Sequence, residues 1–280
     1  MVTAPELYFH AKKIFECNQI ESASFEAMCI IEHVFGKKLA SLLLEKTTAS
    51  EEQKNTVNNL AYRRISGYPL QYLLGKWEFF GLPFYVGEGV LIPRQDTETL
   101  VETVLKIKLP ENPKILDLCS GSGCIAVTLA LNLKNAEVTA VEISDKAVEY
   151  IKKNAKLNDS EINIVMGNVL SGETAKMFSG IDVIVCNPPY LTADDMKALQ
   201  KEVTFEPETA LFGGNDGLDF YKSITKIWRD CLKSGGVLAY EIGMGQESDV
   251  KKMLEENNFT NIEMTKDLSG IIRVVRGEKI

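Results

Sequence analysis

An asparagine, two prolines and a tyrosine, Asn187 to Tyr190, directly follow an apolar stretch that has the length of a buried strand. Two successive prolines fix φ at both positions and remove two backbone donors, so we expect a rigid loop that leaves the Asn187 side chain and nearby carbonyl oxygens facing a pocket. The Asn187 carboxamide and a backbone carbonyl could together accept both hydrogens of an amide or exocyclic amine. We interpret the four residues as catalytic and substrate-binding: Asn187, Pro188, Pro189 and Tyr190, the last as a flat wall. The alternative is a proline-stiffened turn without chemistry.

A glycine-rich turn follows an earlier strand, and an acid ends the next one. The turn, Cys119-Ser-Gly-Ser-Gly123, lets the backbone approach a ligand, and the helix after it offers free N–H groups. Gly121 to Ala126 also satisfies the dinucleotide fingerprint G-x-G-x-x-A, which is a weak signal alone. Glu142 lies 19 residues after Gly123, where a carboxylate can accept from both hydroxyls of a ribose. Turn and acid together predict an adenosine-containing cofactor, either NAD or S-adenosylmethionine. A ligand-free turn and a solvated acid are the alternatives.

Two features favour S-adenosylmethionine over NAD. Asp117 lies at the end of the first strand, where a carboxylate would attract a cationic ammonium or sulfonium but oppose a pyrophosphate. The diproline loop follows a strand whose end is expected to lie opposite the glycine-rich turn. Such a loop has no evident purpose in an NAD enzyme. We therefore expect S-adenosylmethionine as cofactor and S-adenosylhomocysteine as product. An NAD-dependent oxidoreductase and a non-catalytic scaffold are the rivals from other classes.

The expected chemistry is methyl transfer to a planar nitrogen. Such a nitrogen is a poor nucleophile because its lone pair is delocalised, as the peptide rotation barrier of about 18–20 kcal/mol reflects. Two acceptors that hold its hydrogens would orient the nitrogen and stabilise the positive charge that grows on it. Positioning of two bound reactants can contribute about 7–11 kcal/mol, so no strong base is required.

The composition excludes several other functions. Of the 280 residues, 45% are hydrophobic and 25% charged, as in ordinary globular proteins. The net charge of −8 opposes stable nucleic-acid binding, which depends on neutralising phosphates. Six cysteines form no CxxC pair, and two histidines, His10 and His33, leave little room for a metal site or a Ser-His-Asp triad. No apolar run approaches about 18 residues and no secretory signal is visible, so we expect a cytoplasmic protein without metal or membrane span.

The pattern of elements divides the chain into three parts. Residues 1–74 show only helical periodicity, with capping boxes at Thr3 to Glu6 and Ser50 to Gln53, and predict a small helical bundle. Residues 75–95 are aromatic and rich in Gly and Pro, which is typical of a β-hairpin. Residues 96–280 alternate strands and helices and predict a mostly parallel α/β sheet whose last two strands pair antiparallel. The predicted strands are 114–118, 137–142, 162–166, 181–186, 236–242, 261–265 and 271–275.

The diproline loop and the glycine turn together resemble the class I S-adenosylmethionine-dependent methyltransferases that act on planar nitrogen, which have a Rossmann-like sheet. Further motifs resemble, more narrowly, the release-factor glutamine N5-methyltransferases, and the resemblance covers nearly the whole chain. These motifs are Pro69–Gly75, Glu78–Pro83, Leu91–Glu98, Glu206-Pro207 with Ala210-Leu211, Asp216–Asp219, Glu241–Gly243 with Gln246, and Asp267–Gly270 with Arg273.

The resemblance implies methylation of the glutamine in the Gly-Gly-Gln loop of class 1 peptide chain release factors in translation termination. It also implies that the N-terminal helices help to dock that protein, with Leu91 to Glu98 near the junction. Asn187 to Tyr190 would bind the glutamine, and Asn168 and Val169 would lie near the adenine. The cofactor-binding residues are then Asp117, Cys119, Ser120, Gly121, Ser122, Gly123, Glu142, Asn168, Val169 and Asn187.

Three positions depart from the family pattern. The usual Gly-Thr-Gly-Thr-Gly turn is Cys119-Ser-Gly-Ser-Gly123, and the common ribose-binding Asp is Glu142. Both changes keep the expected role, since Ser retains a hydroxyl and Glu reaches one methylene further. A common acid-aromatic pair after the third strand is Asn168-Val169, which changes the expected adenine contact.

One rival remains within the same chemistry. An N6-adenine or N2-guanine nucleic-acid methyltransferase would use an Asn-Pro-Pro-Tyr site equally well. The negative net charge and the lack of a basic target-recognition insert oppose it.

Overall fold

The computed structural model describes residues 1–280, whose contacts divide the chain into two compact units. The helical unit comprises Met1–Lys76 together with Gln200–Phe205, and the sheet unit comprises Trp77–Leu199 and Glu206–Ile280. The boundaries that the sequence predicts, after residues 74 and 95, stay predictions. No sequence feature indicated that residues 200–205 join the helical unit.

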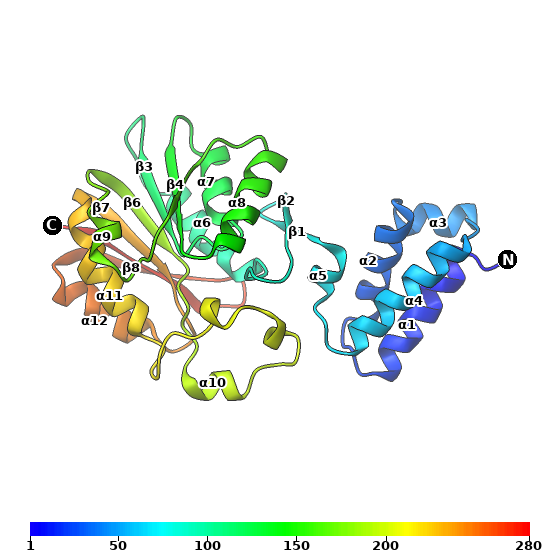
Figure 1. Cartoon of the computed structure of the whole chain (residues 1–280). Helices are drawn as coiled ribbons and strands as arrows, with labels where there is room; N and C mark the ends of the chain where they lie inside the picture. The colour runs from blue at the N-terminus through cyan, green and yellow to red at the C-terminus, as the bar shows by residue number, and fades with distance from the viewer. The chain divides into compact units, whose positions relative to one another are not determined.

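The helical unit contains five helices, which are coloured blue to cyan in Figure 1. They are α1 (Ala4–Cys17), α2 (Ala23–Phe35), α3 (Leu39–Glu45), α4 (Glu51–Ile65) and α5 (Leu70–Leu74). Both predicted capping boxes are present, at the N-terminal ends of α1 and α4. The sequence reading missed α3, a seven-residue helix without a side-chain cap.

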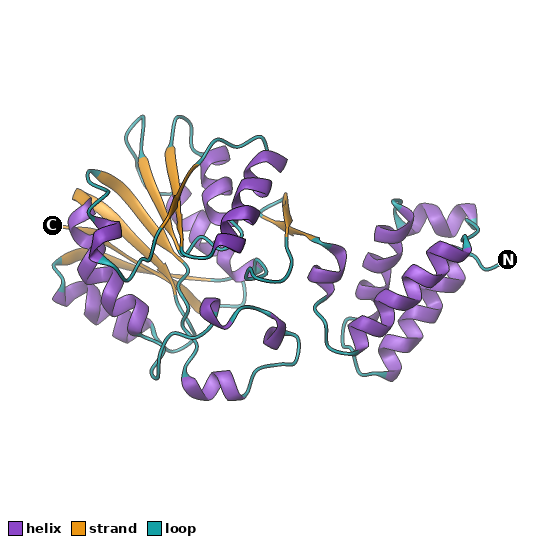
Figure 2. Cartoon of the chain, viewed as in Figure 1, coloured by secondary structure: helices purple, strands orange, loops and turns teal.

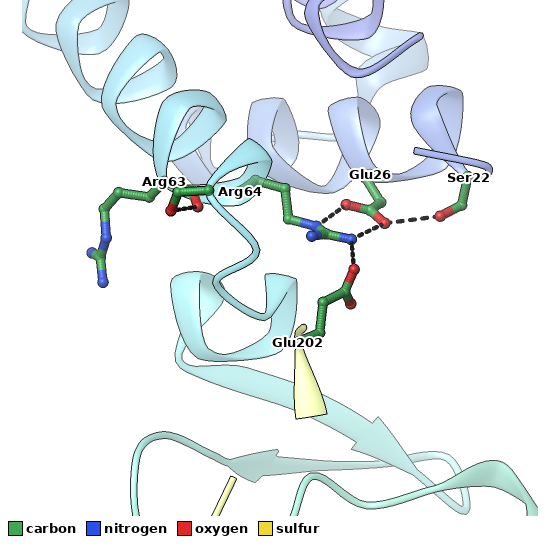
Figure 3. Close-up of polar contacts among 6 residues, drawn as sticks. Ser22, Glu26, Arg63, Arg64 and Glu202 are labelled. Carbon is green, nitrogen blue, oxygen red and sulfur yellow. Dashed lines mark hydrogen bonds and ion pairs between the residues drawn. The ribbon is translucent and has the colours of Figure 1, made fainter. Parts of the chain in front are cut away.

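A buried ion pair joins three segments of the helical unit. The guanidinium of Arg64 on α4 binds Glu26 of α2, and its Nη2 lies 2.5 Å from Oε1 of Glu202 (Figure 3). Arg64 is 4% exposed and Glu26 is 6% exposed. The ring of Phe205 packs edge-on against Tyr68, with 5.1 Å between centroids. These contacts explain why residues 200–205 belong to this unit although 123 residues separate them from Lys76 in the chain.

The sheet unit is built on a seven-stranded sheet with the order β5-β4-β3-β6-β7-β9-β8, drawn in orange in Figure 2. β3 to β7 run parallel, and β9 pairs antiparallel with both β7 and β8. The predicted antiparallel pairing of the last two strands is therefore confirmed. The strands are β3 (Lys114–Leu118), β4 (Glu137–Glu142), β5 (Asn163–Met166), β6 (Ile181–Cys186), β7 (Leu232–Glu241), β8 (Phe259–Lys266) and β9 (Ile272–Lys279), and a separate hairpin is formed by β1 (Lys76–Phe79) and β2 (Leu82–Tyr85).

The last strands are longer than the sequence predicts. β7 begins at Leu232 rather than at Gly236, and β9 continues to Lys279 rather than ending at Val275. Apart from Leu232, the extra residues are polar or glycine, so the hydrophobic pattern alone does not mark them. The antiparallel pairing of β9 with β7 extends to Val237 and Glu278, so backbone hydrogen bonds continue β9 beyond its last apolar residues.

Helices cover both faces of this sheet (Figure 1). Alternate residues of each strand point to opposite faces, so Ile115 packs with α6, α7 and α8, whereas Leu116 packs with α11 and α12. The helices are α6 (Glu98–Leu105), α7 (Cys124–Asn132), α8 (Asp145–Leu157), α9 (Gly172–Ala175), α10 (Ala193–Lys197), α11 (Asp219–Trp228) and α12 (Glu247–Glu256), with short 3-10 turns at Gln95–Thr97, Val203–Phe205, Glu208–Ala210 and Arg229–Cys231. No helix combines the length and the apolar character needed to cross a membrane.

The Arg64 ion pair gives a test of the helical unit. Replacement of Arg64 by Leu should lower the free energy of unfolding by about 3–5 kcal/mol, because Glu26 would stay buried without a cation. Both tryptophans, Trp77 and Trp228, belong to the sheet unit. Urea unfolding followed by circular dichroism at 222 nm therefore measures the loss, and tryptophan fluorescence monitors the other unit.

The matched control is Arg63→Leu on the same helix, which removes a cation held 4.3 Å above the ring of Tyr68. That contact is worth about 0.5–1 kcal/mol at an exposed site. Equal stability of the two variants would contradict a structural role for the buried pair.

Candidate active site

The carboxyl ends of β3, β4, β5 and β6 open into one cavity of about 430 Å³ in the sheet unit. Ligands of open α/β sheets bind at this edge. Most lining residues come from three groups: the turn after β3, the segments after β4 and β5, and two loops around residues 89–97 and 207–212. The predicted residues that line it are Cys119, Ser120, Gly121, Ser122, Glu142, Asn168, Val169, Asn187 and Pro189.

The turn after β3 requires its glycines for two different reasons. Gly121 has φ +55°, and a Cβ there would meet only a carbonyl oxygen at 4.0 Å, so its open side faces the cavity. Gly123 has φ +80°, and a Cβ would come within 3.1 Å of Ile151. Gly123 therefore serves the packing of α8 against the turn, and it does not line the cavity.

Asp117 is fully buried beneath this turn. Its Oδ2 accepts a hydrogen bond from Ser120 Oγ at 2.5 Å and one from the backbone N–H of Ala126 at 3.1 Å. Its Oδ1 has no partner, and burial raises the pKa of the carboxyl to about 7. Asp117 does not line the cavity, so the structure assigns it to holding the turn, and its predicted contact with a cofactor stays a prediction.

Glu142 ends β4 and lies directly at the cavity wall. Its Oε2 accepts from the N–H of Gly121 at 2.8 Å, and its Oε1 accepts from Ile143 and Ser144 at 2.8 and 2.9 Å. A carboxylate offers about four acceptor positions, so these three bonds leave capacity for a ligand hydroxyl. The Glu142 side chain thus connects the glycine turn to the carboxyl end of β4.

The segment after β5 is held by hydrogen bonds of its own. Asn168 Oδ1 accepts from the N–H of Leu170 at 2.9 Å, and the carbonyl of Val169 accepts from Trp228 Nε1 at 2.7 Å. Both residues line the cavity, as the sequence predicts, and Val169 and Leu170 make part of its wall apolar. Their contact with an adenine stays a prediction.

The diproline loop lies partly as predicted. Asn187 and Pro189 line the cavity, whereas Pro188 and Tyr190 do not. The Tyr190 ring packs against the core beside α11, and burial raises the pKa of its phenol, which keeps it protonated. Gln246 Nε2 donates a hydrogen bond to the backbone carbonyl of Tyr190 at 3.0 Å, and this bond anchors the end of the loop. The predicted role of Tyr190 as a flat wall of the substrate site stays a prediction.

Thr97 is a site residue that the strand-end reasoning missed. It lies in the 3-10 turn before α6, is 2% exposed, and lines the cavity. Asn187 Nδ2 donates a hydrogen bond to Thr97 Oγ1 at 3.3 Å. The only signal for Thr97 in the sequence was its place within the family motif Leu91–Glu98.

The two loops around residues 89–97 and 207–212 were noted as family motifs but not as parts of the site. One acid, Glu206, connects them. Glu206 is 6% exposed, binds the guanidinium of Arg94, and accepts from the N–H of Ile92 at 2.9 Å. The segment that follows it contributes Pro207 and Phe212 to the cavity wall. Because both loops follow no parallel strand, rules based on strand ends could not identify them.

Comparison with known proteins assigns the family. Residues 6–75 match the PrmC N-terminal domain, and residues 95–211 match the Methyltransferase small domain. A release factor glutamine methyltransferase of Fusobacterium nucleatum is 45% identical over 233 residues, which cover 82% of this chain but only 65% of that protein. One of Thermodesulfovibrio yellowstonii is 39% identical over 255 residues, 89% of this chain and 90% of that protein.

A solved methyltransferase structure from Pyrococcus furiosus supports the fold alone, with a TM-score of 0.54 at 18% identity over 82% of this chain and 99% of that chain. The sequence relatives carry the assignment further, because their identity extends through both units. The chain belongs to the release factor glutamine methyltransferase family.

Proposed function

We propose that this chain transfers the methyl group of S-adenosylmethionine to the side-chain amide nitrogen N5 of the glutamine in the Gly-Gly-Gln loop of class 1 peptide chain release factors. The observation that carries the proposal is Asn187 at the cavity wall, with its Nδ2 taken by Thr97. Its Oδ1 is then the end of the carboxamide that is left to accept from an incoming amide. The names of the relatives support the protein substrate.

The residues of the cavity fit an adenosine cofactor. Gly121 has no side chain, which leaves a cradle, an open space in the cavity wall that a Cβ would begin to fill. Glu142 keeps an acceptor position for a ribose hydroxyl. The volume of about 430 Å³ lies within the range of about 300–1,000 Å³ that is typical of small-molecule sites. Val169 and Leu170 offer an apolar wall for a base. When bound, S-adenosylmethionine supplies a methyl group that its sulfonium charge activates.

The chain's own groups orient the acceptor. Asn187 Oδ1 and a backbone carbonyl of the diproline loop accept the two hydrogens of the glutamine amide and hold its nitrogen in one direction. Both oxygens carry negative partial charge, so they stabilise the positive charge that develops on nitrogen. Pro188 and Pro189 keep the loop from relaxing, and no side chain has to remove a proton before transfer.

The helical unit is proposed to dock the release factor. It matches the PrmC N-terminal domain, whereas the cavity lies wholly within the sheet unit. A substrate the size of a release factor needs recognition beyond one glutamine, and a separate helical unit offers such a surface.

Labelled methyl transfer tests the substrate. Purified chain, methyl-labelled S-adenosylmethionine and a class 1 release factor should give label on the release factor, located to the loop glutamine by mass spectrometry. A release factor with that Gln replaced by Ala should stay unlabelled. Label on DNA or ribosomal RNA, with none on the release factor, would instead favour the nucleic-acid methyltransferase alternative.

Asn187→Ala tests the acceptor role. We expect turnover to fall by about 10²–10³, the usual effect of removing one preorganised hydrogen-bonding group, while cofactor binding stays measurable. Asn132→Ala is the control, because Asn132 binds only the Thr128 carbonyl at the end of α7 and lies outside the cavity. An unchanged turnover number in Asn187→Ala would remove this residue from the mechanism.

Gly121→Val tests the cofactor cradle. The new side chain should project into the cavity and weaken S-adenosylmethionine binding at least tenfold by calorimetry. Part of any effect could come from backbone strain, about 1–2 kcal/mol for a left-handed residue. Gly36→Val in the helical unit has a similar φ, +63°, and equally open space, so it controls for strain. Equal affinity in both variants would refute the cradle.

A further inference from the structure

Arg273 belongs to a sequence motif that the proposed mechanism does not use. It is the second residue of β9, and its side chain is 18% exposed. Because β9 runs antiparallel to β7, it begins at the edge of the sheet where β7 ends, and the N–H of Ile242 donates to the Arg273 carbonyl at 2.8 Å. β7 is parallel to β6, so Arg273 lies at the edge of the sheet that carries the cavity.

Two carboxylates hold the Arg273 guanidinium. Its Nε donates to Oδ2 of Asp267 at 3.0 Å, and its Nη2 lies 3.0 Å from Oδ2 of Asp96. Asp267 is fixed in turn, because its Oδ1 accepts from the backbone N–H groups of Ser269 and Ile271 at 2.8 and 2.9 Å. A planar guanidinium that bonds two acids in this way has few orientations left, so the position of Asp96 is tied to β9.

Asp96 directly precedes the residue that contacts Asn187. Asp96 and Thr97 both belong to the 3-10 turn before α6, and Thr97 Oγ1 accepts from Asn187 Nδ2 at 3.3 Å. On the other side of Thr97, Glu98 Oε1 accepts at 2.7 Å from the N–H of Phe80, which lies between β1 and β2. Thr97 is therefore anchored through both of its chain neighbours, to β9 on one side and to the β1–β2 hairpin on the other.

The burial of these groups separates a positioning role from a stabilising one. The Asp96 side chain is 45% exposed, and partly exposed ion pairs contribute little to the stability of a fold. Thr97, in contrast, is 2% exposed and lines the cavity, whereas Asp96 and Arg273 do not. Loss of the pair should therefore leave the sheet unit folded while it frees the turn that carries Thr97.

We propose that Arg273 and Asp96 are positioning residues for methyl transfer: their ion pair holds the turn before α6, so that Thr97 occupies Nδ2 of Asn187 and Oδ1 is left for the substrate amide. This inference rests on the proposed function for its consequence in catalysis. The bond between Asn187 and Thr97 is already long at 3.3 Å, so a small shift of the turn breaks it and frees the carboxamide to rotate. Neither Arg273 nor Asp96 meets the reacting atoms, and both act through Thr97.

Asp96→Ala is the central variant, because it releases the turn and leaves Arg273 bound to Asp267. We expect kcat for release-factor methylation to fall about tenfold or more, as for a small misplacement of a catalytic group. The KM for the release factor should change by less than about threefold, since Asp96 lies outside the cavity. Asp96→Glu keeps a carboxylate for Arg273 and should recover most of the lost kcat. An unchanged kcat in Asp96→Ala would overturn the proposal.

The matched control is Glu263→Ala. Glu263 on β8 pairs with Arg276, which lies on β9 like Arg273; Nη2 of Arg276 is 2.7 Å from Oε2 of Glu263, and the two side chains are 15% and 61% exposed. This variant also removes a partly exposed acid from an arginine of β9, but the acid has no cavity residue beside it. We expect kcat to stay within about twofold of the parent. Equal losses of kcat in Glu263→Ala and Asp96→Ala would refute the positioning role.

A second readout does not depend on activity. In chain labelled with ¹⁵N at asparagine side chains, the Nδ2 signal of Asn187, assigned by its loss in Asn187→Ala, should shift in Asp96→Ala but not in Glu263→Ala. An Asn187 signal that is the same in Asp96→Ala and the parent would contradict the proposal. If that signal responds to Asp96 while the parent chain labels no release factor, the positioning role stands and the substrate assignment fails.

Discussion

The orientation of a single carboxamide, that of Asn187, is the constraint on which the proposed methyl transfer depends. An amide nitrogen has a delocalised lone pair, so it cannot be activated by removing a proton at neutral pH and must instead be held by acceptors. In the proposed mechanism Asn187 is one of these acceptors, and the hydrogen bond from its own NH₂ to Thr97 leaves its Oδ1 for the substrate amide. The same contact thus accounts for why a residue before α6 belongs to a site whose other groups follow strands.

The parallel sheet supplies the rigidity that such an arrangement needs. Leu118 of β3 pairs with Cys186 of β6, and Cys186 pairs with Tyr240 of β7, so three strand ends are fixed relative to one another by backbone hydrogen bonds. The glycine turn, the diproline loop and Glu241 continue from these three ends. Their separation is therefore set by the spacing of strands rather than by loops, which are the more mobile part of most proteins.

Much of the fold and part of the site were predictable from the sequence, for identifiable reasons. Strand-end residues such as Gly121, Glu142 and Asn187 were found because parallel strands place their carboxyl ends at one edge. Thr97 was not found by that rule, because it precedes a helix and is brought in by tertiary packing. Tyr190 was predicted to be a ligand wall from its residue type; its ring is partly buried against the core, and its contact with a substrate stays a prediction.

The helical unit illustrates a different limit. Residues 200–205 form only a short 3-10 turn, and they join this unit through the bond of Arg64 to Glu202, 138 positions away in the sequence, and the packing of Phe205 on Tyr68. Local patterns carry no information about a contact at that distance, whereas the capped helices α1 and α4 were predicted from four residues each. Local sequence patterns therefore predicted the helices, whereas the assignment of residues 200–205 to the helical unit depends on contacts between residues far apart in the sequence.

Two acids near the cavity, Asp117 and Glu241, are buried in the sheet unit at a cost in stability. Asp117 and Glu241 each have a pKa raised to about 7 and one oxygen without a partner. An unfolded chain would release these protons near pH 4, so between about pH 4 and pH 7 the folded chain binds more protons than the unfolded one. Stability contributed by these groups therefore falls as pH rises through that window, and at pH 7 ionisation of either acid opposes folding. An apolar residue in place of Asp117 would avoid this penalty, but it could not accept the hydrogen bond from Ser120 that holds the glycine turn.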